Sequence, residues 1–259
     1  DTGNTAVGAL ALYENTSGHN NTAVGRLALS CNTTGACNTA VGLCALSNNT
    51  TSSQNTAFGI FALCANTDGI RNTALGRQSM CSNTTGCCNV AVGSNTLLSG
   101  TTGNYNIAVG GAALASANTG NNNTAVGACA MNSNTSGANN TAVGSCALKA
   151  NTTGQNNVAV GLIALTSATT AYENVGVGRE TLYDLTTGGC NVAVGRDAGR
   201  NVTTGGNNVF IGRQAGTDAV FNLTTQSNNI VMGNNSHQSA YIKIDWTVTS
   251  DLRDKTEVK

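Results

Sequence analysis

The sequence predicts an all-β fold, a parallel β-solenoid made of 17-residue coils. Three observations predict it. A short motif that ends in glycine recurs thirteen times with a constant period of 17 residues, from Gly8 to Gly212. An asparagine stands four residues before every one of these glycines. Thr, Val, Asn and Gly, which recur in the units, are poor helix formers, and helical repeat families have longer periods.

Each unit is expected to contain a short strand, a glycine corner, a second apolar segment and a polar turn. Residues 4–7, Asn-Thr-Ala-Val, are the first strand, and the turn is typified by residues 32–35, Asn-Thr-Thr-Gly. Glycine and asparagine tolerate the left-handed backbone that such corners need. A fourteenth unit ends at Gly233, 21 residues after Gly212, so the linker before it is four residues longer. Stacked about 4.8 Å apart, thirteen coils would span roughly 60 Å.

The repeated asparagine is predicted to form a buried ladder, with side-chain amides bonded along the stack. The ladder consists of Asn4, Asn21, Asn38, Asn55, Asn72, Asn89, Asn106, Asn123, Asn140, Asn157, Asn174, Asn191, Asn208 and Asn229.

Alternation in the strand places Thr5 and Val7 on one face and Ala6 on the other. We expect the Thr and Val positions, together with the leucine that follows the corner, to fill a thin core. The alanine stripe would then lie outside and allow three chains to pack around a threefold axis as a homotrimer.

Composition excludes several classes. The chain has 12 basic and 12 acidic residues, a net charge of zero and no proline. A nucleic-acid partner would require an excess of basic residues. A membrane span would require about 20 consecutive apolar residues, and collagen would require abundant proline. Neither nucleic acid nor membrane insertion is therefore expected. Because the chain starts at Asp1, we expect an internal fragment.

The unit Ala-Val-Gly-x-x-Ala resembles the head repeat of trimeric autotransporter adhesins (YadA-like heads). The resemblance covers residues 4 to about 240, although a 17-residue coil is longer than is usual in that family. It implies a left-handed β-roll and a homotrimer.

Residues 241–248 alternate, with Ile242, Ile244 and Trp246 on one face, and Ser250-Asp251-Leu252-Arg253-Asp254-Lys255 follows. This resembles the start of the intramolecular chaperone domain of phage tailspikes and tail fibres, including endosialidases. The resemblance implies that Ser250 and Lys255 form a self-cleavage dyad, with Lys255 as the base. The expected organisation is a repeat solenoid over 1–216, an irregular last coil over 217–240, a transition strand over 241–249 and the chaperone start over 250–259.

Ten cysteines and two histidines, His19 and His237, lack zinc-site spacing, so neither a metal nor another cofactor is expected. Cys129 and Cys146 share one register on adjacent coils and are a candidate disulfide, with free thiols the equal alternative. Glycosylation motifs occur at Asn15, Asn32, Asn49, Asn83, Asn134 and Asn151.

The expected function is a structural fibre or adhesin on a virion surface, extracellular, that attaches to a glycan or protein of the host cell. A cellular trimeric adhesin is the first alternative. The second is a glycan-cleaving tailspike, which needs paired carboxylates. Glu14, Glu173, Glu180, Asp184 and Asp197 form no convincing pair in the sequence, so no enzyme beyond self-cleavage is expected.

Overall fold

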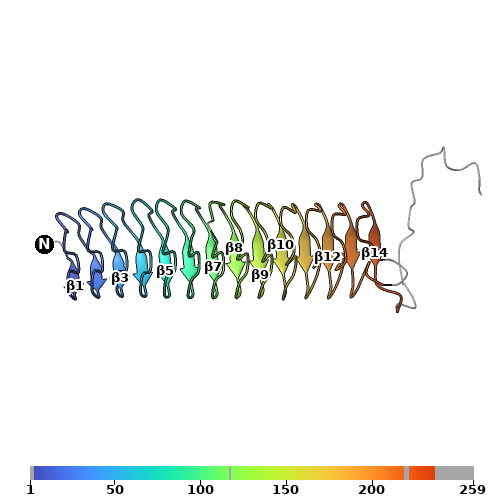
Figure 1. Cartoon of the computed structure of the whole chain (residues 1–259), viewed down its shortest axis with the longest axis horizontal. Helices are drawn as coiled ribbons and strands as arrows, with labels where there is room; N and C mark the ends of the chain where they lie inside the picture. The colour runs from blue at the N-terminus through green and yellow to red at the C-terminus, as the bar shows by residue number, and fades with distance from the viewer. Residues whose placement is uncertain (1–2, 117, 219–221, 237–259) are drawn as a thin grey trace, which may run out of the picture.

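The computed structural model describes residues 3–116, 118–218 and 222–236 of the chain. Within these residues fourteen three-residue strands pair in chain order into one parallel sheet, which is the predicted β-solenoid (Figure 1). The strands are β1 (Thr5–Val7), β2 (Thr22–Val24), β3 (Thr39–Val41), β4 (Thr56–Phe58), β5 (Thr73–Leu75), β6 (Val90–Val92), β7 (Ile107–Val109), β8 (Thr124–Val126), β9 (Thr141–Val143), β10 (Val158–Val160), β11 (Val175–Val177), β12 (Val192–Val194), β13 (Val209–Ile211) and β14 (Ile230–Met232).

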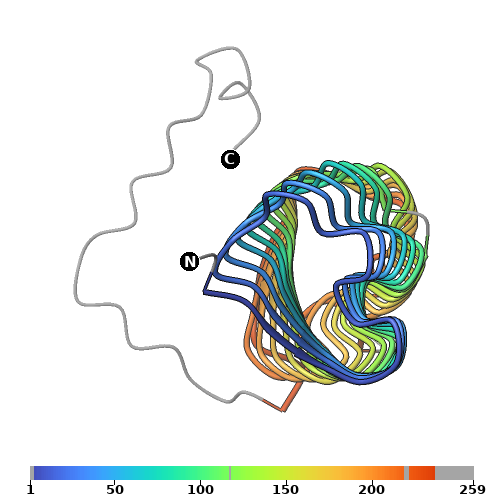
Figure 2. The same ribbon diagram turned by 90° about the vertical axis from the view of Figure 1, so that its left-hand side faces the viewer.

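Every strand pairs with the equivalent residues of the next coil. Thr5 pairs with Thr22 at one end of the sheet, and Val209 pairs with Ile230 at the other, across the longer last linker. Figure 2 shows the coils end on as indented loops that rotate gradually along the axis. The 17-residue period therefore sets the register of the whole sheet.

The corner glycines keep neighbouring coils in contact. From Gly8 to Gly212 their φ angles lie between 106° and 141°, a region that L side chains rarely adopt. A Cβ on Gly144 would also lie 2.3 Å from the carbonyl oxygen of Gly161, its equivalent in the next coil. Both the backbone angle and the close approach require glycine here.

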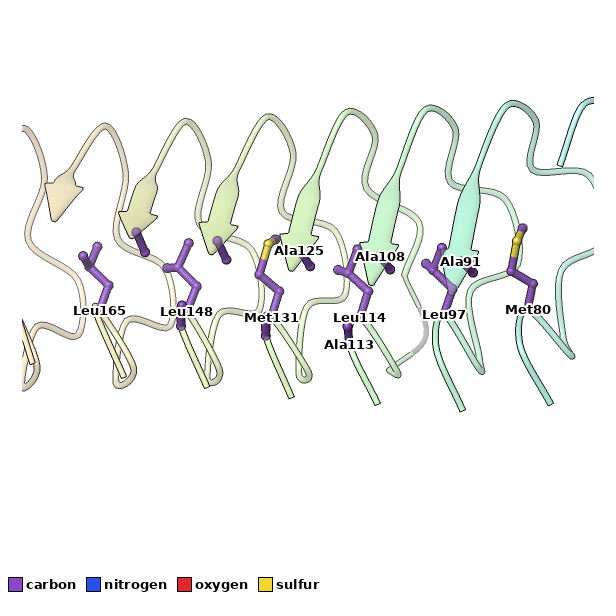
Figure 3. Packing of buried hydrophobic residues seen from close by; sticks show 14 of the residues in the cluster. Met80, Ala91, Leu97, Ala108, Ala113, Leu114, Ala125, Met131, Leu148 and Leu165 are labelled. Carbon is purple, nitrogen blue, oxygen red and sulfur yellow. The ribbon is translucent and has the colours of Figure 1, made fainter. Parts of the chain in front are cut away.

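The strand alanines lie in the core, which overturns the expected orientation of the strand faces. Ala23, Ala125 and their equivalents from β2 to β10 are fully buried, with Gly176 in their place in β11. They face the leucine or methionine of the opposite segment, as Ala125 and Met131 do in Figure 3. The strand Thr and Val side chains point outward and are half-buried or exposed. An alanine stripe on the surface at a threefold axis is therefore wrong.

Side-chain size explains this choice. The interior of so short a coil already holds a leucine and two asparagine positions, so only a small strand residue fits beside them. Branched Thr and Val side chains suit the outer, pleated surface of the sheet.

Candidate interaction surface and internal ladders

The outward face of the sheet is an uncharged strip, apolar at the last position of each strand and Thr, Val or Ile at the first. We define this strand face as the first and last residues of β1–β14; none of them is Asp, Glu, Lys or Arg. Its most exposed large side chains are Val7, Phe58, Leu75, Ile107, Val143, Val177, Val192, Val194, Ile211, Ile230 and Met232. Nearby corner residues, including Leu10, Ile60 and Leu162, are also exposed.

The strand face is large for a soluble monomer. Strand spacing gives it a length of about 60 Å, and two residues per strand give it a width of roughly 10 Å, hence about 600 Å². A patch of that size lies at the upper end of the range for the largest apolar patch of a monomer, and such patches are often functional. The face is also regular, because every coil contributes the same two positions.

The predicted asparagine ladder runs inside the solenoid beside the strands. Its members from Asn21 to Asn208 are buried, while Asn4 and Asn229 at the ends are partly buried. Asn123 is typical: its Nδ2 donates to the Gly137 carbonyl at 2.9 Å, and its Oδ1 accepts from the Asn140 backbone N–H at 3.1 Å. From Asn123 to Asn229 the amides also bond one another directly along the stack, as Asn157 does to Asn140 at 3.1 Å.

A second ladder, which the sequence analysis treated only as a turn, begins at Asn15. Asn32 Nδ2 donates to Asn15 Oδ1 at 2.8 Å, and the pattern continues through Asn49, Asn66 and Asn83. After a gap at Gly100 it resumes from Asn118 through Asn134 to Asn151. Asparagine at a 17-residue spacing was the signal that could have revealed it.

The second ladder ends where asparagine gives way to apolar residues. Ala168, Leu185 and Val202 take its place in the next three coils, and all three are fully buried. The Oδ1 atom of Asn151 is consequently buried without a hydrogen-bond partner among the described residues. The C-terminal part of the solenoid thus has a more apolar core.

These contacts conflict with glycosylation at five of the six candidate motifs. Asn32, Asn49, Asn83, Asn134 and Asn151 are buried members of the second ladder. The Nδ2 of Asn32, for example, donates both to Asn15 Oδ1 and to the Gly35 carbonyl at 3.0 Å. A glycan on this nitrogen would remove a donor and would have to enter the core.

Cys129 and Cys146 are free thiols in the structure, as are the other cysteines. A disulfide between these two remains a prediction. Cys64 and Cys81 share one register on adjacent coils, and Cys44 lies near Cys64. Burial, together with the neighbouring Cys64, raises the pKa of the Cys81 thiol. Burial also raises the pKa of Cys44.

Two of the five carboxylates considered for glycan cleavage are held in ion pairs. Glu180 is nearly buried and pairs with Arg179 and with Arg200, the latter at 3.1 Å. Asp197 pairs with Arg196 at 3.1 Å. The guanidinium of Arg200 also lies 5.0 Å from the centre of the Tyr183 ring. This cluster joins neighbouring coils electrostatically.

Ser250 and Lys255 lie outside the described residues, so their cleavage role stays a prediction. In the described part of the chain, no helix is long and apolar enough to cross a membrane. The same residues include no group of three or more His, Cys, Asp or Glu side chains placed to hold a metal ion. No protein-family model matches this chain, and no curated protein matches it in sequence.

Proposed function

We propose that this chain forms the shaft of a homotrimeric attachment fibre on a virion surface, with three solenoids packed through their strand faces. The observation that carries the proposal is the uncharged strip, apolar at the last position of each strand, along fourteen successive strands. Stable interfaces bury about 800 Å² per partner. In a trimer the strand face of about 600 Å² is shared between two neighbours, so the flanking exposed residues supply the remainder of each interface. The choice of three copies rests on the resemblance to trimeric adhesin heads.

Sedimentation equilibrium tests the interface. Wild-type protein should have three times the 26.0 kDa chain mass. The triple variant Val126→Lys, Val143→Glu, Val160→Lys places desolvated charges on the strand face and should sediment as a monomer. Its alternating signs avoid repulsion between stacked coils.

A matched control carries the same charges on another surface. Asn122→Lys, Asn139→Glu, Asn156→Lys alters exposed positions in three successive coils and should leave the trimer intact. A wild-type monomer, or a strand-face variant with unchanged mass, would contradict the proposal.

Maturation by self-cleavage is the second part of the proposal, and it rests on the sequence motif around Ser250. Attack of the Ser250 hydroxyl on the Thr249 carbonyl would break the Thr249–Ser250 amide, free the Ser250 amine and form an ester to Ser250 Oγ, and hydrolysis of that ester by water would leave Thr249 as the new C-terminus. Intact-mass spectrometry of the native fibre measures this. Wild-type chains should end at Thr249, and Ser250→Ala chains should continue past it.

A further inference from the structure

An open groove crosses the outer surface near the C-terminal end of the solenoid. It forms where Gly189 and Gly206 occupy one register in successive coils, eleven residues after the corner glycine. Other coils carry side chains there, for example Ser53, Asn104 and Gln155. The groove has a volume of about 330 Å³. Both glycines line the groove and have no side chain to fill it.

Tyr172, at the same register in the preceding coil, forms one end of the groove. Its backbone makes a parallel bridge to Gly189. A Cβ on Gly189 would lie 2.4 Å from the Cζ atom of the tyrosine ring, so the end of the ring rests directly on this glycine. Gly189 is buried beneath it, while Tyr172 remains 50% exposed. The ring is therefore held in a fixed place and is still accessible.

The remaining lining is polar and uncharged. Its exposed lining side chains include Thr187, Thr204, Cys190, Asn207 and Asn228. Asn207 Nδ2 donates to Asn228 Oδ1 at 2.8 Å. At the far end, the Ser227 hydroxyl accepts from the Gly206 N–H at 2.9 Å.

The charges beside the groove disfavour anionic ligands. No Lys or Arg lines it. The carboxylate of Glu173 accepts a hydrogen bond from the thiol of the lining residue Cys190 at 3.4 Å. A phosphate-bearing or sialylated ligand would find no counter-charge here.

We propose that this groove binds a neutral oligosaccharide, which lies along the fibre axis with one sugar ring on Tyr172. A sugar has an apolar C–H face that suits an aromatic ring, and hydroxyl groups that suit amide and threonine side chains. The coil spacing of about 4.8 Å is comparable to the length of one sugar ring, so each successive coil is placed to contact one sugar. The inference rests on the proposed attachment function and names its ligand class.

Saturation-transfer NMR on the native protein tests this with a panel of neutral tetrasaccharides of glucose, galactose, rhamnose and N-acetylglucosamine, together with a sialylated tetrasaccharide. At least one neutral member should receive magnetisation from the protein. Tyr172→Ala should weaken its binding at least tenfold, whereas Tyr172→Phe should stay within about threefold. Gly206→Gln should abolish binding because it fills the groove.

Two matched variants control for unspecific effects. Tyr105→Ala removes another exposed tyrosine, and Ala138→Gln adds the same side chain at the same register in a distant coil. Both should bind like wild type. If thermal melting shows that Gly206→Gln does not fold, the comparison of Tyr172→Ala with Tyr172→Phe still tests whether the groove binds a glycan.

Binding of the sialylated member alone, no binding at all, or equal binding by Tyr172→Ala and wild type would overturn the glycan assignment. None of these results depends on the sedimenting mass. A trimer that binds no neutral glycan would therefore refute only the groove, and a monomer that binds one would refute only the trimeric shaft.

Discussion

Phe210 occupies core space that Gly199 leaves open. Phe210 stands at the strand position that is alanine in most coils, and it is fully buried. Gly199 stands where most coils have leucine, and a Cβ there would lie 2.8 Å from Phe210 Cδ2. Gly216, the equivalent in the next coil, would bring its Cβ within 2.4 Å of Cε1 of the same ring. The coil thus exchanges a large residue and a small one across its interior.

Reversing this exchange, with alanine at position 210 and leucine at position 199, should recover part of the stability that Phe210→Ala alone loses. Phe210→Ala alone should lower the free energy of unfolding by about 3 to 4 kcal/mol because it leaves a cavity. Adding Gly199→Leu should recover part of this loss, since Gly199 has φ 60° and the core leucine Leu182 at that register has φ 48°. A double-mutant cycle by denaturant unfolding measures the coupling. Tyr13→Ala, at an exposed site, should have little effect, and additive losses would contradict the exchange.

Substitution of a corner glycine should disrupt stacking. Gly144→Ala forces a side chain at φ 135° and places its Cβ 2.3 Å from the Gly161 carbonyl oxygen. We expect a loss of more than about 3 kcal/mol, or failure to fold, because neither backbone can move away without breaking the ladder. Gly111→Ala is the control, since its Cβ would meet nothing within 4 Å. Thermal melting of the two variants should differ clearly; similar curves would argue against close stacking at the corner.

The strand asparagine should matter more than an exposed one. Asn123→Ala removes the acceptor for the Asn140 N–H and leaves that group buried and unpaired, whereas the Gly137 carbonyl loses the Asn123 amide but keeps its hydrogen bond from Asn134 Nδ2. An unpaired buried N–H costs about 1 to 3 kcal/mol, so the loss should be at least of that size. Asn48→Ala, at an exposed position outside the left-handed backbone region, should change stability by less than about 0.5 kcal/mol. Denaturant unfolding of both variants checks this.

The repeat period predicted the solenoid because one register of Gly and Asn satisfies a stacked coil and little else. Alternation showed that Thr5 and Val7 share a face, but alternation alone does not say which face is inside. The sizes of the residues indicate which face is inside. Phe210 opposite Gly199 shows a paired size change within one core, and the Cδ1 atom of Leu165 lies 2.2 Å from the place of a Cβ on Gly176, at the strand alanine position of β11. Such contacts mark the strand alanine position as interior.

The groove could not be read from the sequence in the same way. Gly189 and Gly206 look like two more turn glycines among 32 in the chain. Their effect depends on where Tyr172 places its ring, and that position follows from coil stacking. The second asparagine ladder, in contrast, was visible as a 17-residue spacing and was missed because Asn-Thr-Thr-Gly is also a common turn.

The last prediction concerns the reactivity of Cys190, which is exposed and donates a hydrogen bond to Glu173. The Glu173 carboxylate accepts this bond and repels the thiolate, which raises the pKa of the Cys190 thiol, and partial burial adds to the effect. Because its pKa is raised, a smaller fraction of Cys190 is thiolate at a given pH than would be the case for an unperturbed cysteine. Glu173→Gln removes the repelling charge and lowers the pKa, so alkylation by iodoacetamide at pH 8 should become faster, because the gain in thiolate outweighs its lower intrinsic nucleophilicity. Raising the pH should narrow the difference in the Cys190 alkylation rate between the two proteins, since both thiols approach full ionisation.

Cys37, an exposed thiol at the same register in another coil, is the internal control and should react at an unchanged rate. An unchanged rate at Cys190 in Glu173→Gln, measured by peptide mass spectrometry, would show that the contact does not govern this thiol.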